Sequence, residues 1–505
     1  MRKLLLIPAL GMLAFLAACG GSGNAGFGSS TVGNFSAASI SGNYTYQIYG
    51  WDLGVQGTTA TPFREAGVFT ADGKGNITAG EDDYAEGTTV VTHTITSGTY
   101  TVANDGTGDA TLNFNNGGGI HVDLTVASSS LVYVITDAIG PFSSTALFAN
   151  GYGTVELQTA SAFSAAPSGT FVFRKHTVTA GQTNSTSTVG VFTVSSGTVS
   201  AGTEDVNQNG AITQLNLTAG NFTTPDSQGR GTGTLTDSNA TTTTFDYYVV
   251  NASSIRLFST DTGNTGLGRA EAQSTSSFSN ASLSGGYAFG ADGDDSTTGL
   301  DGLKTVGRFN GDGGGNLTAG ALDTNADGTP ASNVSFTGMY NIASNGRGTA
   351  SETSSTVPLI FYLVSPSRGF FLVNDATVVE DGTFDAQTGT FSNSSMNGQY
   401  AFNMDGFDTS GNLWDWIGWL RGDGSGNLSS SEVLNPDGSP STTGIVSGSY
   451  SVMSNGRATG SINNGIFSNA STGLVFYLVS SSSGYVLEPD TGFQVSGFMT
   501  KQQTP

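Results

Sequence analysis

The chain has 505 residues, of which 74 are Gly and only 11% are charged, and its formal net charge is −23. This composition excludes a long helical protein, which would be rich in charged helix-forming residues. The excess of acid argues against a nucleic-acid partner, because neutralising phosphates requires Lys and Arg. A single Cys excludes a disulfide scaffold.

The chain begins with the pattern of a secretory signal. Arg2 and Lys3 precede an apolar stretch over 4–15, which is too short to span a bilayer. The stretch ends in Leu16-Ala17-Ala18-Cys19, which resembles the lipobox of bacterial lipoproteins. The resemblance implies that a signal peptide, residues 1–18, is removed. It also implies that Cys19 carries a covalent diacylglycerol and acyl lipid, with no other cofactor.

The segment after the lipobox predicts how the protein is attached. Residue 20 is Gly rather than the Asp that resembles an inner-membrane retention signal, which favours the outer membrane of the cell envelope. Residues 19–34 are rich in Gly and Ser and predict a flexible tether. Without residues 1–18 the chain keeps 14 basic and 39 acidic residues, net −25. Attachment to the membrane is therefore expected through the lipid and not through a basic patch.

The rest of the chain repeats one unit four times. The pair Phe-Ser recurs at Phe35, Phe163, Phe278 and Phe391, and each copy is followed by Gly-x-aromatic. The motif Asp-Gly-x-Gly-Asn recurs at 72–76, 312–316 and 423–427. Landmarks in one order define internal repeats. We predict repeats at 35–162, 163–277, 278–390 and 391–505.

Each repeat has the pattern of a β meander. In the third repeat the predicted strands are 286–291, 305–310, 317–323, 334–343, 348–353, 359–365, 369–374 and 379–385. Asn-Gly and Asp-Gly links between strands are typical of tight hairpins. The sequence therefore predicts an all-β protein of four tandem antiparallel meanders, each a closed barrel of about eight strands, the size of lipocalin or avidin barrels. A β-sandwich is the alternative.

Two acidic segments raise the question of calcium. The segments beginning at Asp205 and Asp323 match the first half of an EF-hand loop. The bidentate Glu at position 12 is replaced by Asn216 and Val334, and no helices flank the segments. We therefore predict hairpin turns and no metal. The weak calcium candidates are Asp205, Asn207, Asp323, Asn325 and Asp327.

Aromatic side chains give the best hint of binding. The candidate binding residues are Trp414, Trp416, Trp419 and Trp51. Strand alternation places Trp414 and Trp416 on one face with Leu420, where they are expected to fill the last barrel. It places Trp419 on the opposite face. A Trp outside a barrel can stack on a sugar ring or pack against a neighbouring repeat.

No motif in the sequence predicts catalysis. The three His, His93, His121 and His176, lie in the first two repeats, without a third metal ligand or a nucleophile motif. We predict no enzymatic activity and no catalytic residue. Neighbouring carboxylates such as Asp82 and Asp83 leave a carboxylate-based glycan hydrolase as an alternative.

The four-copy plan resembles Gly/Ser/Thr-rich tandem β-repeat lipoproteins of bacteria, over residues 35–505. The resemblance implies an architecture and no activity. We expect a lipid-tethered rod of four β domains with a structural, adhesive or multivalent binding role at the cell envelope. Its expected partners are the membrane, through the lipid, and a glycan or protein surface ligand. The alternative is a carrier of small apolar or glycan ligands inside the barrels.

Overall fold

The computed structural model describes residues 33–54, 60–139, 147–179, 184–295, 301–353, 358–464 and 471–504. The signal peptide 1–18, Cys19 and the tether up to residue 32 lie outside these residues. Within the described part, the chain contains strands and four short 3-10 helices. No described helix has the length and apolar character needed to cross a membrane.

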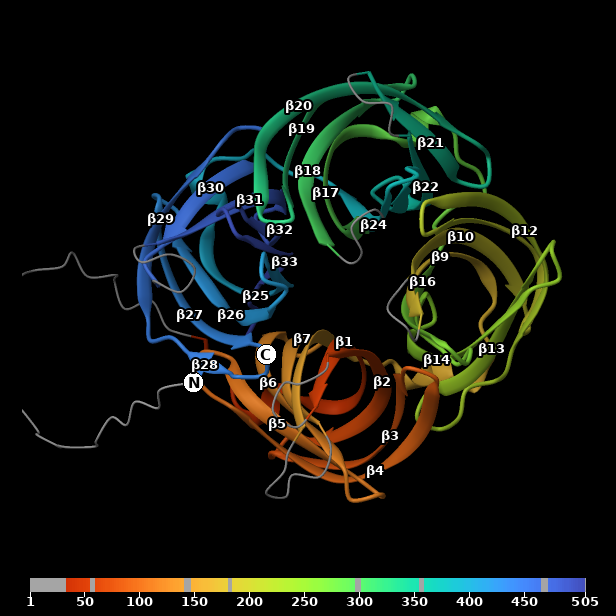
Figure 1. Ribbon diagram of the computed structural model, residues 1–505, viewed down its shortest axis with the longest axis horizontal. Helices are drawn as coiled ribbons and strands as arrows, with labels where there is room; N and C mark the ends of the chain where they lie inside the picture. Colours follow the sequence, from red (N-terminus) through yellow and green to blue (C-terminus); the bar gives the residue numbers. More distant parts are fainter. Residues whose placement is uncertain are drawn as a thin grey trace, which may run out of the picture. The chain divides into compact units, whose positions relative to one another are not determined.

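Each predicted repeat contains one set of strands, coloured in chain order in Figure 1. Barrel 1 is built from β1 (Ser41–Gly54), β2 (Thr61–Asp72), β3 (Asn76–Glu86), β4 (Thr89–Val102), β5 (Thr107–Phe114), β6 (Gly119–Ser128), β7 (Leu131–Ile139) and β8 (Leu147–Leu157). Barrel 2 is built from β9 (Gly169–Thr179), β10 (Ser185–Ser195), β11 (Thr198–Gln208), β12 (Ala211–Phe222), β13 (Arg230–Asp237), β14 (Thr242–Asn251), β15 (Ser254–Ser259) and β16 (Asn264–Ala272).

The second half of the chain repeats this plan. Barrel 3 is built from β17 (Ser284–Asp295), β18 (Asp301–Asp312), β19 (Asn316–Ala326), β20 (Thr329–Ile342), β21 (Arg347–Glu352), β22 (Pro358–Ser365), β23 (Arg368–Val373) and β24 (Val378–Ala386). Barrel 4 is built from β25 (Asn397–Asp408), β26 (Leu413–Asp423), β27 (Asn427–Pro436), β28 (Ser441–Thr442), β29 (Val446–Val452), β30 (Arg457–Ile462), β31 (Thr472–Ser480), β32 (Ser483–Glu488) and β33 (Phe493–Lys501).

The strands pair in chain order and then close on themselves, which confirms the predicted barrels. β1 pairs with both β2 and β8, and the equivalent first strands β9, β17 and β25 pair with β16, β24 and β33. In barrel 4, pairing of β26 with β27 completes the closure, and β28 is a two-residue addition to β27. Several strands are longer than predicted. The run predicted at 286–291, for example, is part of the 12-residue β17.

The Asp-Gly-x-Gly-Asn motif forms the turn between the second and third strands of a barrel. In barrel 1, Asp72 Oδ1 accepts hydrogen bonds from the backbone N–H of Lys74 (2.7 Å) and Asn76 (3.0 Å). Gly73 and Gly75 have φ of 73° and 101°, values that favour Gly. The same bonds form at Asp312 and Asp423. The motif is therefore a local turn device.

The same type of hydrogen bond joins each barrel to the next. The last strand of each barrel is followed by a Gln whose side chain donates to backbone carbonyls of the next barrel. These residues are Gln158, Gln273, Gln387 and Gln502, with bonds of 2.8, 2.8, 2.8 and 2.7 Å. Gln502 reaches Val126 of barrel 1, so barrel 4 contacts barrel 1 as each barrel contacts its successor. The barrels therefore form a closed cycle, and the expected open rod is wrong.

Candidate functional site

Three interfaces between barrels carry the same buried ion pair. An Asp on the third strand of one barrel accepts hydrogen bonds from an Arg and a Tyr of the next. We call this arrangement the clamp. Its members are Asp83 with Arg230 and Tyr248, Asp205 with Arg347 and Tyr362, and Asp323 with Arg457 and Tyr477. The Arg binds the carboxylate through Nε and Nη2, at 2.6–2.9 Å in all three. Bidentate geometry of this kind gives both strength and orientation.

The calcium candidates lie mainly at these interfaces. Asp205 and Asp323 belong to strands β11 and β19, and their carboxylates accept the Arg and Tyr donors of the clamp. Asn207 and Asn325, two residues further on, donate their side-chain amides to backbone carbonyls of the next barrel. Asp327 alone lies in a hairpin turn, with φ of 47°. Nowhere in the described part of the chain do three His, Cys, Asp or Glu gather as metal ligands.

The four Trp have different surroundings. Trp416 is buried inside barrel 4, and Trp414 packs partly buried against the same core. Trp419 faces outward, and its indole N–H donates to Asp105 of barrel 1 at 3.1 Å. Trp51 of barrel 1 is half-buried and meets the ring of Phe407 of barrel 4 edge-on, with ring centroids 6.2 Å apart. Of the four, only Trp51 borders the cavity between the barrels.

Each His is paired with an Asp. His93 Nδ1 lies 2.9 Å from Asp82, His121 lies 2.6 Å from Asp137, and His176 lies 3.2 Å from Asp381. The hydrogen bond that the ring donates to the carboxylate raises the pKa of His93 and of His121. These contacts support the walls and interfaces of the barrels.

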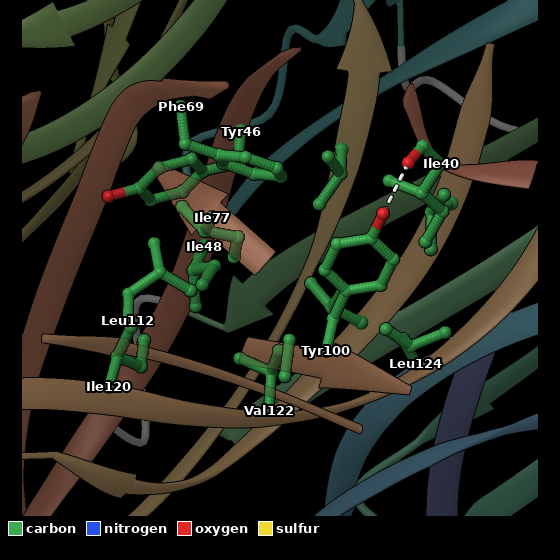
Figure 2. Close-up of a pocket in the computed structure, with 14 residues that line it drawn as sticks. Ile40, Tyr46, Ile48, Phe69, Ile77, Tyr100, Leu112, Ile120, Val122 and Leu124 are labelled. Atoms are coloured by element: carbon green, nitrogen blue, oxygen red, sulfur yellow. Dashed lines mark hydrogen bonds between the residues drawn. The ribbon is translucent and has the colours of Figure 1, made fainter. Parts of the chain in front are cut away.

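The interior of barrel 1 is packed with apolar side chains. Tyr46, Phe69, Ile77 and Leu112 line a space of about 40 Å³ in this interior. Figure 2 shows these side chains around it. At its edge the Tyr100 hydroxyl donates to the Ile40 carbonyl at 2.6 Å. Ligand pockets usually measure about 300–1,000 Å³. This interior therefore has no room for a carried ligand.

A much larger cavity of about 790 Å³ lies between the barrels, and all four barrels contribute to its wall. Seven of the chain's 16 Lys and Arg line it: Arg64, Arg174, Lys175, Arg256, Arg269, Lys304 and Arg368. Seven acidic residues also line it: Glu156, Glu271, Asp292, Asp381, Asp385, Asp405 and Asp415. The formal charge of the lining is thus zero, although the whole chain carries −23.

Most of these charges are paired across the interfaces. Arg256 of barrel 2 holds Glu156 of barrel 1 through two bonds of 2.6 Å, and Arg368 of barrel 3 holds Glu271 of barrel 2 at 2.8 Å. Lys304 of barrel 3 donates to Asp405 of barrel 4 at 2.7 Å. Because these ion pairs are buried, salt screens them much less than it screens ion pairs on the surface. The scarce basic residues therefore organise the cavity wall.

Sequence reasoning missed this site, although a signal for it exists. The interface residues Gln158, Gln273, Gln387 and Gln502 are spaced by 115, 114 and 115 residues. The position two residues earlier is Glu156, Glu271, Asp385 and Thr500, and these four side chains meet Arg256, Arg368, Tyr485 and Tyr133 of the following barrel. An end-of-repeat alignment would have found both series. That these residues join neighbouring barrels is visible only in the closed cycle of barrels.

No protein-family model matches this chain, and no curated protein matches its sequence. Among solved structures, it resembles transferrin-binding protein B of Haemophilus parasuis Hp5, at 11% identity over 76% of this chain and 86% of that one, with a TM-score of 0.19. The Neisseria meningitidis serogroup B protein of that name matches at 11% identity over 74% and 85%, with a TM-score of 0.20. A DUF3598-family protein of Nostoc punctiforme matches at 11% identity over 43% and 95%, with a TM-score of 0.16. These are distant structural similarities, and at such TM-scores they carry no argument about function.

Proposed function

We propose that this protein is a lipid-anchored, non-catalytic binding protein of the cell envelope that holds an uncharged oligosaccharide in the cavity between its four barrels. The observation that carries the proposal is the cavity of about 790 Å³, whose lining combines polar and aromatic side chains at no net charge. Its volume falls within the range usual for ligand sites.

The chemistry of the lining suits a ligand with many hydroxyl groups. A hydroxyl both donates and accepts, so it matches a wall that holds both carboxylates and the side chains of Arg and Lys. Aromatic rings offer apolar faces to the C–H side of a sugar, and Tyr49, Trp51 and Tyr152 line the cavity. An ionic ligand of either sign would meet as many like charges as opposite ones.

The binding proposal is tested with neutral hexasaccharides. We expect the purified protein to bind at least one of cellohexaose, maltohexaose, xylohexaose and chitohexaose in isothermal titration calorimetry. Trp51→Ala should weaken that binding about tenfold, which corresponds to about 1.4 kcal/mol. Trp414→Ala is the matched control, because Trp414 is also half-buried but lies outside the cavity lining.

The outcomes are distinct. Equal weakening by both Trp variants would point to a general loss of folding. Absence of binding by every oligosaccharide would contradict the proposed ligand class. Appearance of new reducing ends during incubation would contradict the non-catalytic part of the proposal and favour a glycan hydrolase.

The membrane anchor rests on the lipobox pattern that ends at Cys19. We expect the protein expressed in a two-membrane bacterium to sediment with outer membranes and to incorporate radiolabelled palmitate. Cys19→Ala should abolish the label and release the protein from the membrane fraction, because no basic patch would replace the lipid. Retention of the variant in the membrane would contradict this assignment.

A further inference from the structure

One part of the cavity wall, where barrels 3 and 4 meet, has a specific arrangement of charged groups. Lys304 is 4% exposed, and its Nζ donates to Asp405 at 2.7 Å and to Asp292 at 3.1 Å. Asp405 and Asp415 are directly opposite each other on β25 and β26. Opposite residues of antiparallel strands have their Cβ atoms about 4.5–5.5 Å apart on one face. The two carboxyl groups therefore stand side by side, next to one ammonium group.

Asp415 has a hydrogen-bonding atom without a partner. The residue is 3% exposed and lines the cavity, and its Oδ2 makes no hydrogen bond within the described structure. A buried polar atom left unpaired is costly and uncommon in folded proteins. Lys304 is already engaged by the other two carboxylates. A group from a bound molecule would complete the hydrogen bonding of Asp415.

An apolar surface adjoins these polar groups. Phe407 and Leu413 are paired across the same two strands, two residues from the carboxylates and thus on the same face. Both line the cavity, and the Trp51 ring meets Phe407 edge-on. A sugar ring presents hydroxyls along its edge and C–H groups on its face. The wall offers a match to each.

We propose that Asp405, Asp415 and Lys304 form the subsite that hydrogen-bonds two neighbouring hydroxyls of a sugar ring, whose apolar face packs against Phe407. This inference rests on the proposed function. In the subsite, one hydroxyl meets the free oxygen of Asp415. The neighbouring hydroxyl donates to Asp405 and accepts from the Lys304 ammonium group, which has a third N–H. A ring that lacks vicinal hydroxyls would satisfy one of these groups and leave the others unpaired.

The test replaces the unpaired carboxyl by an apolar group of similar size. We expect Asp415→Leu to weaken binding of the best hexasaccharide by tenfold or more in isothermal titration calorimetry. Its melting temperature should be equal to that of the native protein or higher, because removing a buried unpaired carboxyl does not weaken packing. Asp123→Leu is the control: it changes a half-buried acidic strand residue, in barrel 1, outside the cavity lining.

A second measurement separates a hydroxyl subsite from a cation site. A deoxy analogue that lacks the hydroxyl facing Asp415 should bind the native protein more weakly than the parent sugar, and Asp415→Leu should bind the two equally. When calcium or magnesium is titrated without sugar, the native protein and Asp415→Leu should give the same heat. Loss of such heat in the variant would overturn the inference in favour of a cation site.

The two proposals fail in different ways. If the native protein binds a hexasaccharide and Asp415→Leu binds it equally well, the subsite is wrong and the cavity function stands. If the native protein binds none of the four hexasaccharides, the proposed function fails and the subsite with it. A fall in melting temperature that accounts for the lost affinity would show that Asp415 is structural.

Discussion

Several buried carboxyl groups in this protein hold their protons more tightly than usual. Burial raises the pKa of Glu488 to about 9, of Glu380 to about 7 and of Asp405 to about 6. At Asp405 the nearby Lys304 ammonium opposes the effect of burial. Burial also raises the pKa of Asp415 well above its usual range, and the charge of Asp405 adds to the rise. These carboxyl groups therefore bind protons more tightly in the folded chain than in the unfolded chain.

Glu488 should therefore make folding depend on pH. The group is fully buried, one of its oxygens has no partner, and its folded pKa of about 9 exceeds the usual 4.5. Between these values the folded state binds more protons than the unfolded state, so the free energy of unfolding falls as pH rises from about 4.5 to 9. Glu488→Gln should raise the free energy of unfolding at pH 8.5 by roughly 2–4 kcal/mol and flatten its pH dependence.

The measurement is urea unfolding at pH 5.0, 7.0 and 8.5. Asp327→Asn is the control, because Asp327 is an exposed turn carboxyl. If the free energy of unfolding of Glu488→Gln depends on pH as steeply as that of the native protein, groups other than Glu488 cause the dependence.

At the scale of the elements, three of the four interfaces between barrels contain the clamp, and the fourth does not. The clamp occurs between barrels 1 and 2, 2 and 3, and 3 and 4. Strand register gives the equivalent positions where barrel 4 meets barrel 1, and they hold Val433, Thr107 and Thr125 in place of Asp, Arg and Tyr. All three members are replaced together. This agrees with the physical expectation that a buried charge is stable only with its partner.

The same logic predicts the effect of removing a clamp. Burial would raise the pKa of Asp323, but the hydrogen bonds from Arg457 and Tyr477 outweigh it and lower that pKa. Asp323→Ala leaves Arg457 buried and unpaired, so we expect the free energy of unfolding to fall by about 3–5 kcal/mol. The triple variant Asp323→Val, Arg457→Met and Tyr477→Phe should recover most of that loss. Urea unfolding measures both, and a triple variant as unstable as the single one would contradict the interpretation.

At the scale of the whole molecule, the cycle of barrels is closed by the end of the chain. The Gln502 side chain donates to Val126 at 2.7 Å, and the backbone N–H of Gln503 donates to Ala127 at 2.8 Å. An apolar cluster containing Tyr133 and Ile417 supports the contact. In the described residues no ion pair joins barrel 4 to barrel 1, whereas ion pairs join every other neighbouring pair.

Closure should therefore be sensitive to the C-terminus. Barrels 1 and 2 are joined by the chain itself, which keeps their contact at high effective concentration, but barrels 4 and 1 have no such link. Gln502→Ala should speed hydrogen exchange of the segment Leu131–Ile139, which lies at the closing interface, by several-fold. Gln158→Ala, which removes the equivalent bond between barrels 1 and 2, should change exchange at its own interface less. If the two variants speed hydrogen exchange equally, the covalent link between barrels 1 and 2 does not stabilise their contact.

The sequence alone determined the repeats, the all-β class and the meander order, because these follow from local turns and from alternation along each strand. It favoured barrels over a β-sandwich, and the pairing of first and last strands decided between the two. The Asp72 turn needs only residues within four positions of it. The lipid on Cys19 stays a prediction of the same local kind. Tertiary structure decided the rest: the sequence predicted a hairpin turn at Asp205, with calcium as a weak candidate, but Asp205 lies on strand β11 and its carboxylate accepts hydrogen bonds from Arg347, 142 residues away. The cavity depends on side chains from four barrels, and local patterns contain no information on which outward faces meet.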